Sequence, residues 1–138
     1  MIYQFWLIPI AKKKKKINGG KNGAIKVFFS SHTGNSRGIA ILFNNTFPFT
    51  LHNEIYDKNG NYLILDVSIQ ECRMTLAALY GPNEDSPNFY THLQEMITSL
   101  QNSSIIMVGD WNVVQDYNLD TCNYKMKNNL NSHKKFKT

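Results

Sequence analysis

The sequence contains few of the residues that staple small secreted domains or hold a chain in a membrane. It has only two cysteines in 138 residues, Cys72 and Cys122, and neither belongs to a CxxC or CxxH pattern. This excludes a disulfide framework and a zinc finger, and we interpret both as buried or free thiols in a reducing compartment, with one disulfide as the alternative. The apolar start, residues 1–10, is too short to span a bilayer, and lysines follow it, whereas a signal peptide carries its charge first.

Positive charge is also scarce in the middle of the chain. The formal net charge is +5, which by itself suggests an anionic partner. However, residues 27–123 hold three basic and all ten acidic residues, a net charge of −7, while twelve lysines lie in the flanks. An acidic domain does not attract a phosphate backbone unless a cation mediates. We therefore consider the hypothesis that the function of this domain depends on a metal ion.

The two ends differ in composition from the middle, so we predict three parts. Residues 1–24 form an unrelated or disordered lysine-rich segment, residues 25–123 form the folded domain, and residues 124–138 form a polar, lysine-rich tail. Residues 12–16 are five consecutive lysines, which repel one another and stay solvated. Two interpretations of this run stay open: a nucleic-acid-binding or nuclear-import arm, or the translation of an adenine-rich tract.

Within the folded domain, the pattern predicts several antiparallel strands. The strands expected from apolar and β-branched residues are residues 25–29, 37–43, 62–69 and 73–80. Asn59-Gly60 predicts a hairpin turn before the third of these. The link at 70–72 is short enough to make the last two strands an antiparallel pair.

One helix and a final strand follow. Ser86 is expected to cap the helix through its side chain, with Pro87 at the first helical position. One apolar stripe then recurs at helical spacing: Phe89, Leu93, Met96, Ile97 and Leu100. A buried strand at residues 104–108 is expected to return to the sheet, which gives an α/β layered arrangement.

Polar side chains occur where two of the predicted strands end. Tyr80 ends one strand in LYGPN, and Asp110 and Asn112 follow the last strand in IIMVGDWN; such positions tend to line a site in α/β sheets. Asp110 can bind a divalent cation or take a proton from water, and Tyr80 can donate its hydroxyl to a phosphate oxygen. Because Asp and Asn also cap ordinary turns, the Asp-x-Asn spacing alone leaves a simple turn open.

Several blocks in order carry a resemblance: SSHTGNSRGIAILF, LYGPNEDSPNFY, IIMVGDWN and DYNLDTCNYK. Together they resemble the endonuclease–exonuclease–phosphatase superfamily, in particular the endonuclease domain of non-LTR retrotransposons of the long-interspersed-element type. The resemblance covers about residues 27–135 and implies part of a four-layer, DNase I-like α/β sandwich, mostly antiparallel, with flanking helices. It also implies Mg²⁺-dependent nicking of a DNA phosphodiester bond.

The resemblance assigns roles through two motifs. The family's Tyr-(Ala/Gly)-Pro motif matches residues 80–82, so Tyr80 would contact the scissile phosphate. Its Gly-Asp-Phe-Asn motif matches residues 109–112, with Trp111 in place of Phe as a packing residue. Asp110 would orient or deprotonate the attacking water, Asn112 would help hold the phosphate and Asp110, and both would form the metal site. Asp120 matches an acid that recurs in the family, and we assign it no catalytic role.

Two parts of the family pattern have no counterpart. The family's Gln-Glu-Thr motif supplies a metal-binding Glu, but the first acidic residue of this chain is Glu54, in the hairpin region. The family's Ser-Asp-His motif is also missing, because Ser132-His133-Lys134 lacks the Asp and lies too soon after residues 109–112, so we interpret His133 as a tail histidine. The three other histidines, His32, His52 and His92, match no family position. We therefore expect a fragment truncated at both ends, with doubtful Mg²⁺ binding and impaired or absent catalysis, and leave open whether it is an enzyme.

The expected partner is DNA, with no membrane and no small-molecule cofactor, in an intracellular location that is nuclear if the parent function is retained. An exposed sheet face and exposed strand edges would favour self-association. Two alternatives stay open: a non-catalytic nucleic-acid-binding remnant that acts through its lysine-rich tails, and an enzyme of the same superfamily acting on a phosphoinositide or another small phosphoester.

Overall fold

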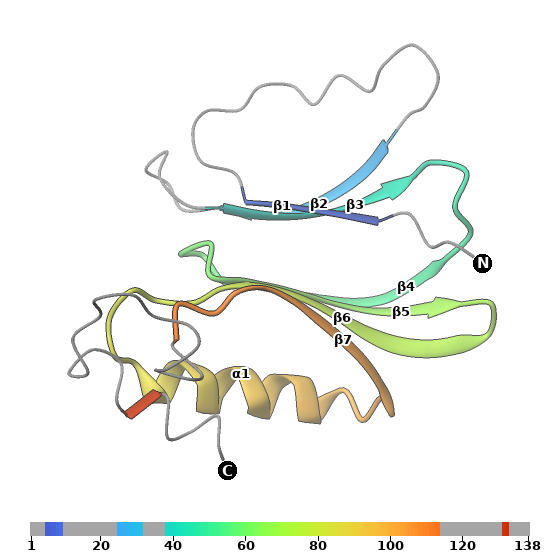
Figure 1. Cartoon of the computed structure of the whole chain (residues 1–138). Helices are drawn as coiled ribbons and strands as arrows, with labels where there is room; N and C mark the ends of the chain where they lie inside the picture. The colour runs from blue at the N-terminus through green and yellow to red at the C-terminus, as the bar shows by residue number, and fades with distance from the viewer. Residues whose placement is uncertain (1–4, 10–24, 32–37, 114–130, 133–138) are drawn as a thin grey trace, which may run out of the picture.

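The computed structural model describes residues 5–9, 25–31, 38–113 and 131–132. In this part of the chain, seven strands form two β-sheets, and a helix at Pro87–Ser99 covers the outer face of the second sheet (Figure 1). The strand orders are β1-β3-β2 and β4-β5-β6-β7. This mixed α/β arrangement, mostly antiparallel, confirms the predicted fold class.

The first sheet is built around a fully apolar central strand. It contains β1 (Phe5–Pro9), β2 (Ile25–Ser31) and β3 (Gly38–Asn44), and β3 pairs antiparallel with both neighbours. β3 is buried from its first residue to Phe43, as its continuous apolar sequence predicts. No strand was expected at β1, which forms one edge of this sheet.

The second sheet is a three-stranded meander extended by one parallel strand. It contains β4 (Thr50–Tyr56), β5 (Tyr62–Ile69), β6 (Cys72–Tyr80) and β7 (Ser104–Asp110). The first three strands run antiparallel, and β7 runs parallel to β6. The carboxyl ends of β4, β6 and β7 therefore lie at the same end of the sheet, together with the β4–β5 turn.

Both turns of the meander match the predicted positions. At the β4–β5 turn, Gly60 has φ +74°, a left-handed conformation that glycine adopts without steric cost. The β5–β6 turn is tighter than the expected three-residue link, because it contains only Gln70 and Glu71, with φ of +50° and +66°. Two successive positive φ values characterise the turn whose twist matches that of the paired strands.

The helix α1 (Pro87–Ser99) begins as predicted with proline in its first turn, but its expected side-chain cap is wrong. The Ser86 hydroxyl makes no capping bond. Instead, the N–H of Phe89 donates to the Ser86 carbonyl at 3.1 Å, so the amide that a capping hydroxyl would have bonded is already taken. The Ser86 N–H donates in turn to the Ser132 hydroxyl at 3.0 Å.

The predicted apolar stripe of α1 packs against the second sheet, with Tyr90 as an additional member. Tyr90, Leu93 and Ile97 are buried. Leu93 and Ile97 contact a sheet face formed by Ile64, Ala77 and Leu79. Alternate residues of the same strands point the other way, because side chains alternate across a strand.

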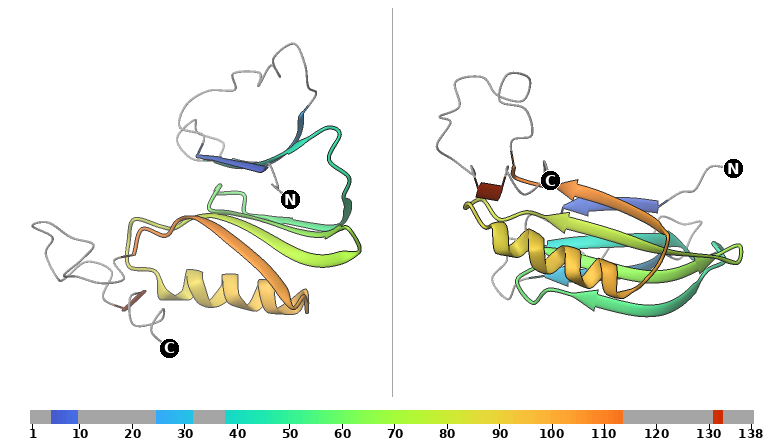
Figure 2. Two further views of the ribbon diagram at one scale, coloured as in Figure 1. Left: turned by 45° about the vertical axis from the view of Figure 1, so that its right-hand side comes forward. Right: turned by 90° about the horizontal axis from the view of Figure 1, so that it is seen from below.

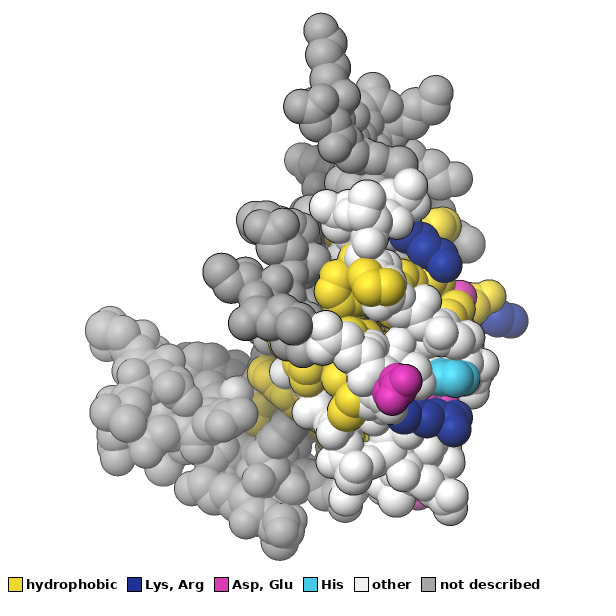
Figure 3. Space-filling view, turned by 90° about the vertical axis from the view of Figure 1, so that its right-hand side faces the viewer, with side chains coloured by type: hydrophobic (Ala, Val, Ile, Leu, Met, Phe, Trp, Pro, Cys, Tyr) yellow, Lys and Arg dark blue, Asp and Glu magenta, His cyan; other side chains and the backbone are white. Residues whose placement is uncertain are grey.

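Those alternate residues form the main core between the two sheets. Its buried members are Phe28, Ile39, Ile41, Phe43, Leu63, Leu65, Val67, Ile69, Leu76 and Ala78. Phe49 stacks on Phe43 with ring centroids 4.1 Å apart. Figure 3 shows hydrophobic side chains reaching the surface on the side of the molecule where the chain crosses from β3 to β4. Phe47 and Phe49, in that crossing, are partly buried against this core. Burying a large apolar side chain contributes roughly 1.5–3 kcal/mol, so this core accounts for the packing of the two sheets.

The expectation of a buried last strand is wrong. β7 extends two residues beyond the predicted end and lies at the edge of its sheet (Figure 2). Its exposed fractions are 47% for Ile105, 38% for Ile106 and 40% for Val108. The apolar sequence resembles that of an interior strand, but no described strand pairs with its outer side. In the described ranges, no helix is long and apolar enough to cross a membrane.

Candidate functional site

The two sequence motifs meet at the carboxyl ends of β6 and β7. Tyr80 and Asp110 are register partners in the parallel pair, each the last residue of its strand. The crossover through α1 produces this juxtaposition, because two consecutive parallel strands must end on the same side of the sheet. The structure therefore brings together the three residues that the sequence singled out, Tyr80, Asp110 and Asn112.

The segments that follow the two strands are cross-linked at Gly81. Its N–H donates to the Asp110 carbonyl at 2.7 Å, and its carbonyl accepts from the Asn112 side-chain amide at 2.6 Å. A Cβ atom at Gly81 would lie 2.1 Å from the Trp111 carbonyl oxygen and 2.6 Å from the Tyr90 hydroxyl. Glycine is thus required here for close approach of two backbones.

Asn112 forms the simple turn that its spacing from Asp110 left open, and it also links the segments after β6 and β7. Its backbone has φ +50°, a left-handed conformation that asparagine tolerates better than most residues. Its N–H donates to Asp110 Oδ1 at 3.0 Å, as in a capped turn. Because its side-chain NH₂ bonds the Gly81 carbonyl, Asn112 acts as a strut between the two strand ends; its roles toward phosphate and metal stay predictions.

Tyr80 is held from the other side by a residue that the sequence analysis did not single out. The Tyr80 N–H donates to the Asn61 carbonyl at 2.7 Å, and the Asn61 side-chain NH₂ donates back to the Tyr80 carbonyl at 3.2 Å. Asn61 is buried, and its own N–H donates to Asp57 Oδ2 at 3.2 Å. Its position directly after Asn59-Gly60 was the available signal, since that turn delivers it to the end of β6.

A second residue missed by sequence reasoning, Tyr90, holds the loop after β7. Its hydroxyl donates to the Trp111 carbonyl. Burial, followed by the negative charges of Asp110 and Asp85, raises the pKa of Tyr90 to about 12. The hydroxyl therefore stays protonated at neutral pH and remains a donor. Tyr90 lies three residues before Leu93, so the helical spacing could have included it.

Asp85, just before α1, anchors the other end of the described chain. Its carboxylate accepts from the Ser132 N–H at 2.8 Å, the Ser132 hydroxyl at 2.7 Å and the Asn131 N–H at 3.0 Å. These bonds, led by the Ser132 hydroxyl, lower the pKa of Asp85. Ser132 is fully buried, a contact that no sequence pattern signalled. His133, Asp120, His32 and Cys122 lie outside the described residues.

The end of the sheet that carries Tyr80 and Asp110 is not a complete metal site in the part of the chain that the structure describes. There, no group of three His, Cys, Asp or Glu side chains converges as metal ligands would. Glu54 lies on β4, separated from β7 by β5 and β6. Asp110 contributes one carboxylate, which already accepts the Asn112 N–H. These residues do not fit a bound Mg²⁺ with a full protein ligand set.

The remaining residues considered in the sequence lie away from this site. His52 and His92 are exposed, and His52 Nε2 is hydrogen-bonded to the Ser68 hydroxyl at 2.7 Å. Cys72 is a free, exposed thiol.

No family model matches the chain. Its structure is similar to the endonuclease domain of TRAS1, a telomere-specific non-LTR retrotransposon, with a TM-score of 0.51 and 17% sequence identity. The match covers 65% of this chain and 42% of that chain. At this identity the similarity establishes the fold: this protein has an α/β sandwich of the DNase I-like type. It spans less than half the length of the TRAS1 domain.

Proposed function

We propose that this chain is part of a Mg²⁺-dependent DNA endonuclease domain of the non-LTR retrotransposon type, with impaired or absent catalysis. One observation supports this above the others. Tyr80 and Asp110 are register partners at the carboxyl ends of adjacent parallel strands, in a fold similar to that of a retrotransposon endonuclease domain. DNA is the proposed partner, and the nucleus is the proposed location.

The chemistry of the three residues supports a phosphodiester substrate. Hydrolysis requires an activated water and stabilisation of the charge that develops on the phosphate. In the proposed site the Asp110 carboxylate accepts a proton from water, and the Tyr80 hydroxyl donates to a phosphate oxygen. Asn112 fixes the spacing of the two through its bond to Gly81.

The incomplete surroundings of Asp110 support low activity. Removal of a single member of a cooperative catalytic site commonly lowers the rate by about 10²–10³-fold or more. Among the described residues, Asp110 belongs to no group of three His, Cys, Asp or Glu side chains that could hold a metal ion. We therefore expect residues placed as in a nuclease site but a low rate of phosphodiester hydrolysis.

A plasmid-nicking assay tests the proposal. The purified chain is incubated with supercoiled plasmid and Mg²⁺, beside Asp110→Ala and the control Glu84→Gln, which changes an exposed acid in the loop before α1. We expect nicking close to the background rate in all three. Robust nicking that is lost only in Asp110→Ala would refute impairment while supporting the nuclease assignment. Robust nicking that survives Asp110→Ala would contradict the proposed site.

A second candidate is a non-catalytic nucleic-acid-binding protein, favoured by the separation of charge along the chain. Twelve lysines flank a central region of net charge −7. Replacement of residues 12–16 by glutamine tests this better than truncation, because β1 belongs to the first sheet. The slope of log binding constant against log salt should fall by roughly 0.7–0.9 per lost phosphate contact. An unchanged slope excludes the lysine run as the binding segment.

A further inference from the structure

The outer edge of β7 lacks the features that usually prevent an edge strand from pairing with another strand. β7 is the last strand of its sheet in the described chain. Its residues from Ser104 to Gly109 include no charged side chain and no proline. Native edge strands are usually protected by lysines, prolines or bulges, and none of these is present here.

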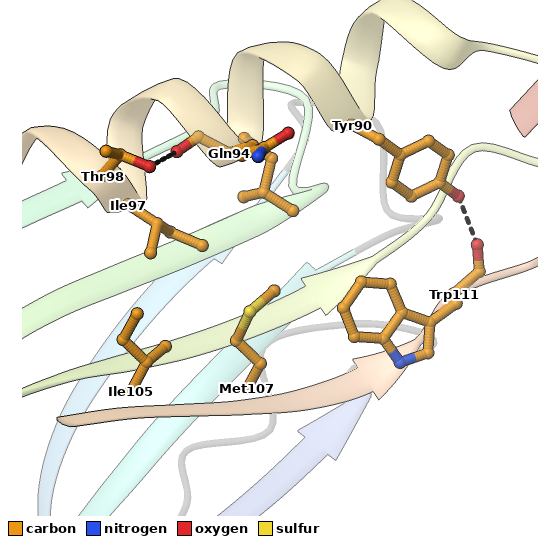
Figure 4. Close-up of a pocket in the computed structure, with 8 residues that line it drawn as sticks. Tyr90, Gln94, Ile97, Thr98, Ile105, Met107 and Trp111 are labelled. Atoms are coloured by element: carbon orange, nitrogen blue, oxygen red, sulfur yellow. Dashed lines mark hydrogen bonds between the residues drawn. The ribbon is translucent and has the colours of Figure 1, made fainter. Parts of the chain in front are cut away.

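An apolar cleft lies beside this edge. It has a volume of about 390 Å³ and lies between α1 and β7, with Leu93, Ile97, Ile105 and Met107 among its lining residues (Figure 4). Tyr90 and the Trp111 indole close one end. Ile105 and Met107 point into the cleft, while Ile106 and Val108 alternate to the opposite face of the strand. Both faces of β7 therefore present apolar side chains.

We propose that β7 pairs antiparallel with β7 of a second copy of this chain, around a two-fold axis at Met107. The two four-stranded sheets then form one continuous sheet across the dimer. In this register Ile106 lies opposite Val108 of the second copy, and Ile105 lies opposite Gly109 of the second copy. A two-fold axis makes the same patch meet itself, so each contact occurs twice.

The charge pattern of the strand favours a second copy as the occupant. Asp110 is the only charged residue of β7. In the antiparallel register it lies opposite Ser104 of the second copy, so the two carboxylates are at opposite ends of the interface. Like charges directly opposite each other would destabilise the pair, and this register contains none.

The area that the β7 edge can bury determines the expected affinity of the dimer. A standard interface buries roughly 800 Å² on each partner, more than one seven-residue edge can supply. The two-fold axis places the two clefts on the same face of the joined sheet, so Ile105 and Met107 of each copy add to the contact. Main-chain hydrogen bonds would supply much of the affinity, as in other strand additions. We therefore expect a weak dimer that depends on concentration.

Sedimentation equilibrium of the full chain over a ~100-fold concentration range measures this association. The test variant is Ile106→Lys, and the control is Tyr56→Lys, which places the same charge on β4 at the opposite edge of the same sheet, where Tyr56 is 56% exposed. We expect the dimer dissociation constant to rise at least about tenfold in the first variant and to stay unchanged in the second. A monomer at every concentration, larger irregular aggregates, or equal effects of the two lysines would overturn the proposal.

A cross-linking experiment keeps the test independent of variant folding. Met107→Cys is made in a background in which Cys72 and Cys122 are replaced by serine, beside Tyr56→Cys as control. Because the axis passes at residue 107, mild oxidation should convert Met107→Cys to a disulfide-linked dimer and leave the control monomeric. Equal or absent cross-linking in the two variants contradicts pairing through β7. Neither experiment depends on nuclease activity, so the proposed function can fail separately.

Discussion

Gly81→Ala is the substitution that most directly tests the junction between the β6 and β7 motifs. The added methyl group would lie 2.1 Å from the Trp111 carbonyl oxygen. Non-bonded heavy atoms prefer about 3.5 Å, so the two segments would have to move apart by about 1.4 Å. The bonds from Gly81 N to Asp110 O at 2.7 Å and from Asn112 Nδ2 to Gly81 O at 2.6 Å would break.

The expected loss of stability follows from those contacts. Each hydrogen bond contributes about 1 kcal/mol, and each buried group left without a partner costs more. Gly81→Ala should therefore lower the free energy of unfolding by about 2–4 kcal/mol. Where space permits, the same substitution usually raises it by about 0.4–1 kcal/mol through the unfolded chain. The sign of the effect thus distinguishes a tight junction from an open loop.

Urea unfolding followed by far-ultraviolet circular dichroism gives the measurement, with Asn83→Ala, an exposed change in the same loop, as control. A double-mutant cycle with Asn112→Ala sharpens it. If Asn112 is a strut onto Gly81, the two changes should be less than additive by about 1 kcal/mol. A loss below about 1 kcal/mol for Gly81→Ala, or full additivity with Asn112→Ala, would refute the described junction.

Three further outcomes can be measured on the same protein. Because the pKa of Tyr90 is raised to about 12, its contribution is constant below pH ~10 and is lost as pH rises through 12, by up to about 2 kcal/mol; Tyr90→Phe should reduce this alkaline loss in urea titrations at several pH values. The buried Asp66 accepts two hydrogen bonds from Arg73, at 3.0 and 2.6 Å, and these lower the pKa of Asp66. Its contribution is therefore present above pH ~4 and lost on acidification, and Arg73→Ala should lower the urea midpoint at pH 7 and flatten this acid dependence. Asp85→Ala, which removes the accepting carboxylate, should abolish hydrogen-exchange protection at the Ser132 amide, while Glu84→Ala should leave it; equal protection in both would contradict the anchor.

The elements that the sequence predicted are those whose cause is local. Asn59-Gly60 allows a hairpin because glycine adopts a positive φ there. Pro87 begins a helix because its fixed φ suits the first turn. The sequence also placed Tyr80 and Asp110 at strand ends that tend to line a site, and the structure adds the parallel pairing that makes them neighbours.

The parts that were missed depend on partners far away in the chain. Asn61 holds Tyr80 only because β5 and β6 pair in one particular register. Ser132 bonds Asp85 across 47 residues, and no periodic pattern encodes such a contact. The exposure of β7 could not be read from its apolar sequence, because composition reports what a strand could bury and not whether a neighbour is present.

The order of strands in the second sheet has a consequence for how the chain folds. β4, β5 and β6 are neighbours both in sequence and in space, joined by tight turns, so their loops close with little loss of entropy. β7 can pair only after the whole segment containing α1 has been made and has crossed the sheet, and non-local pairing of this kind is slow. During synthesis the meander can therefore form first. The edge of β6 that later pairs with β7 stays unpaired until then. Asp110 and Asn112 arrive with the last strand, so the candidate site should be the latest part of this sheet to form and the first to open.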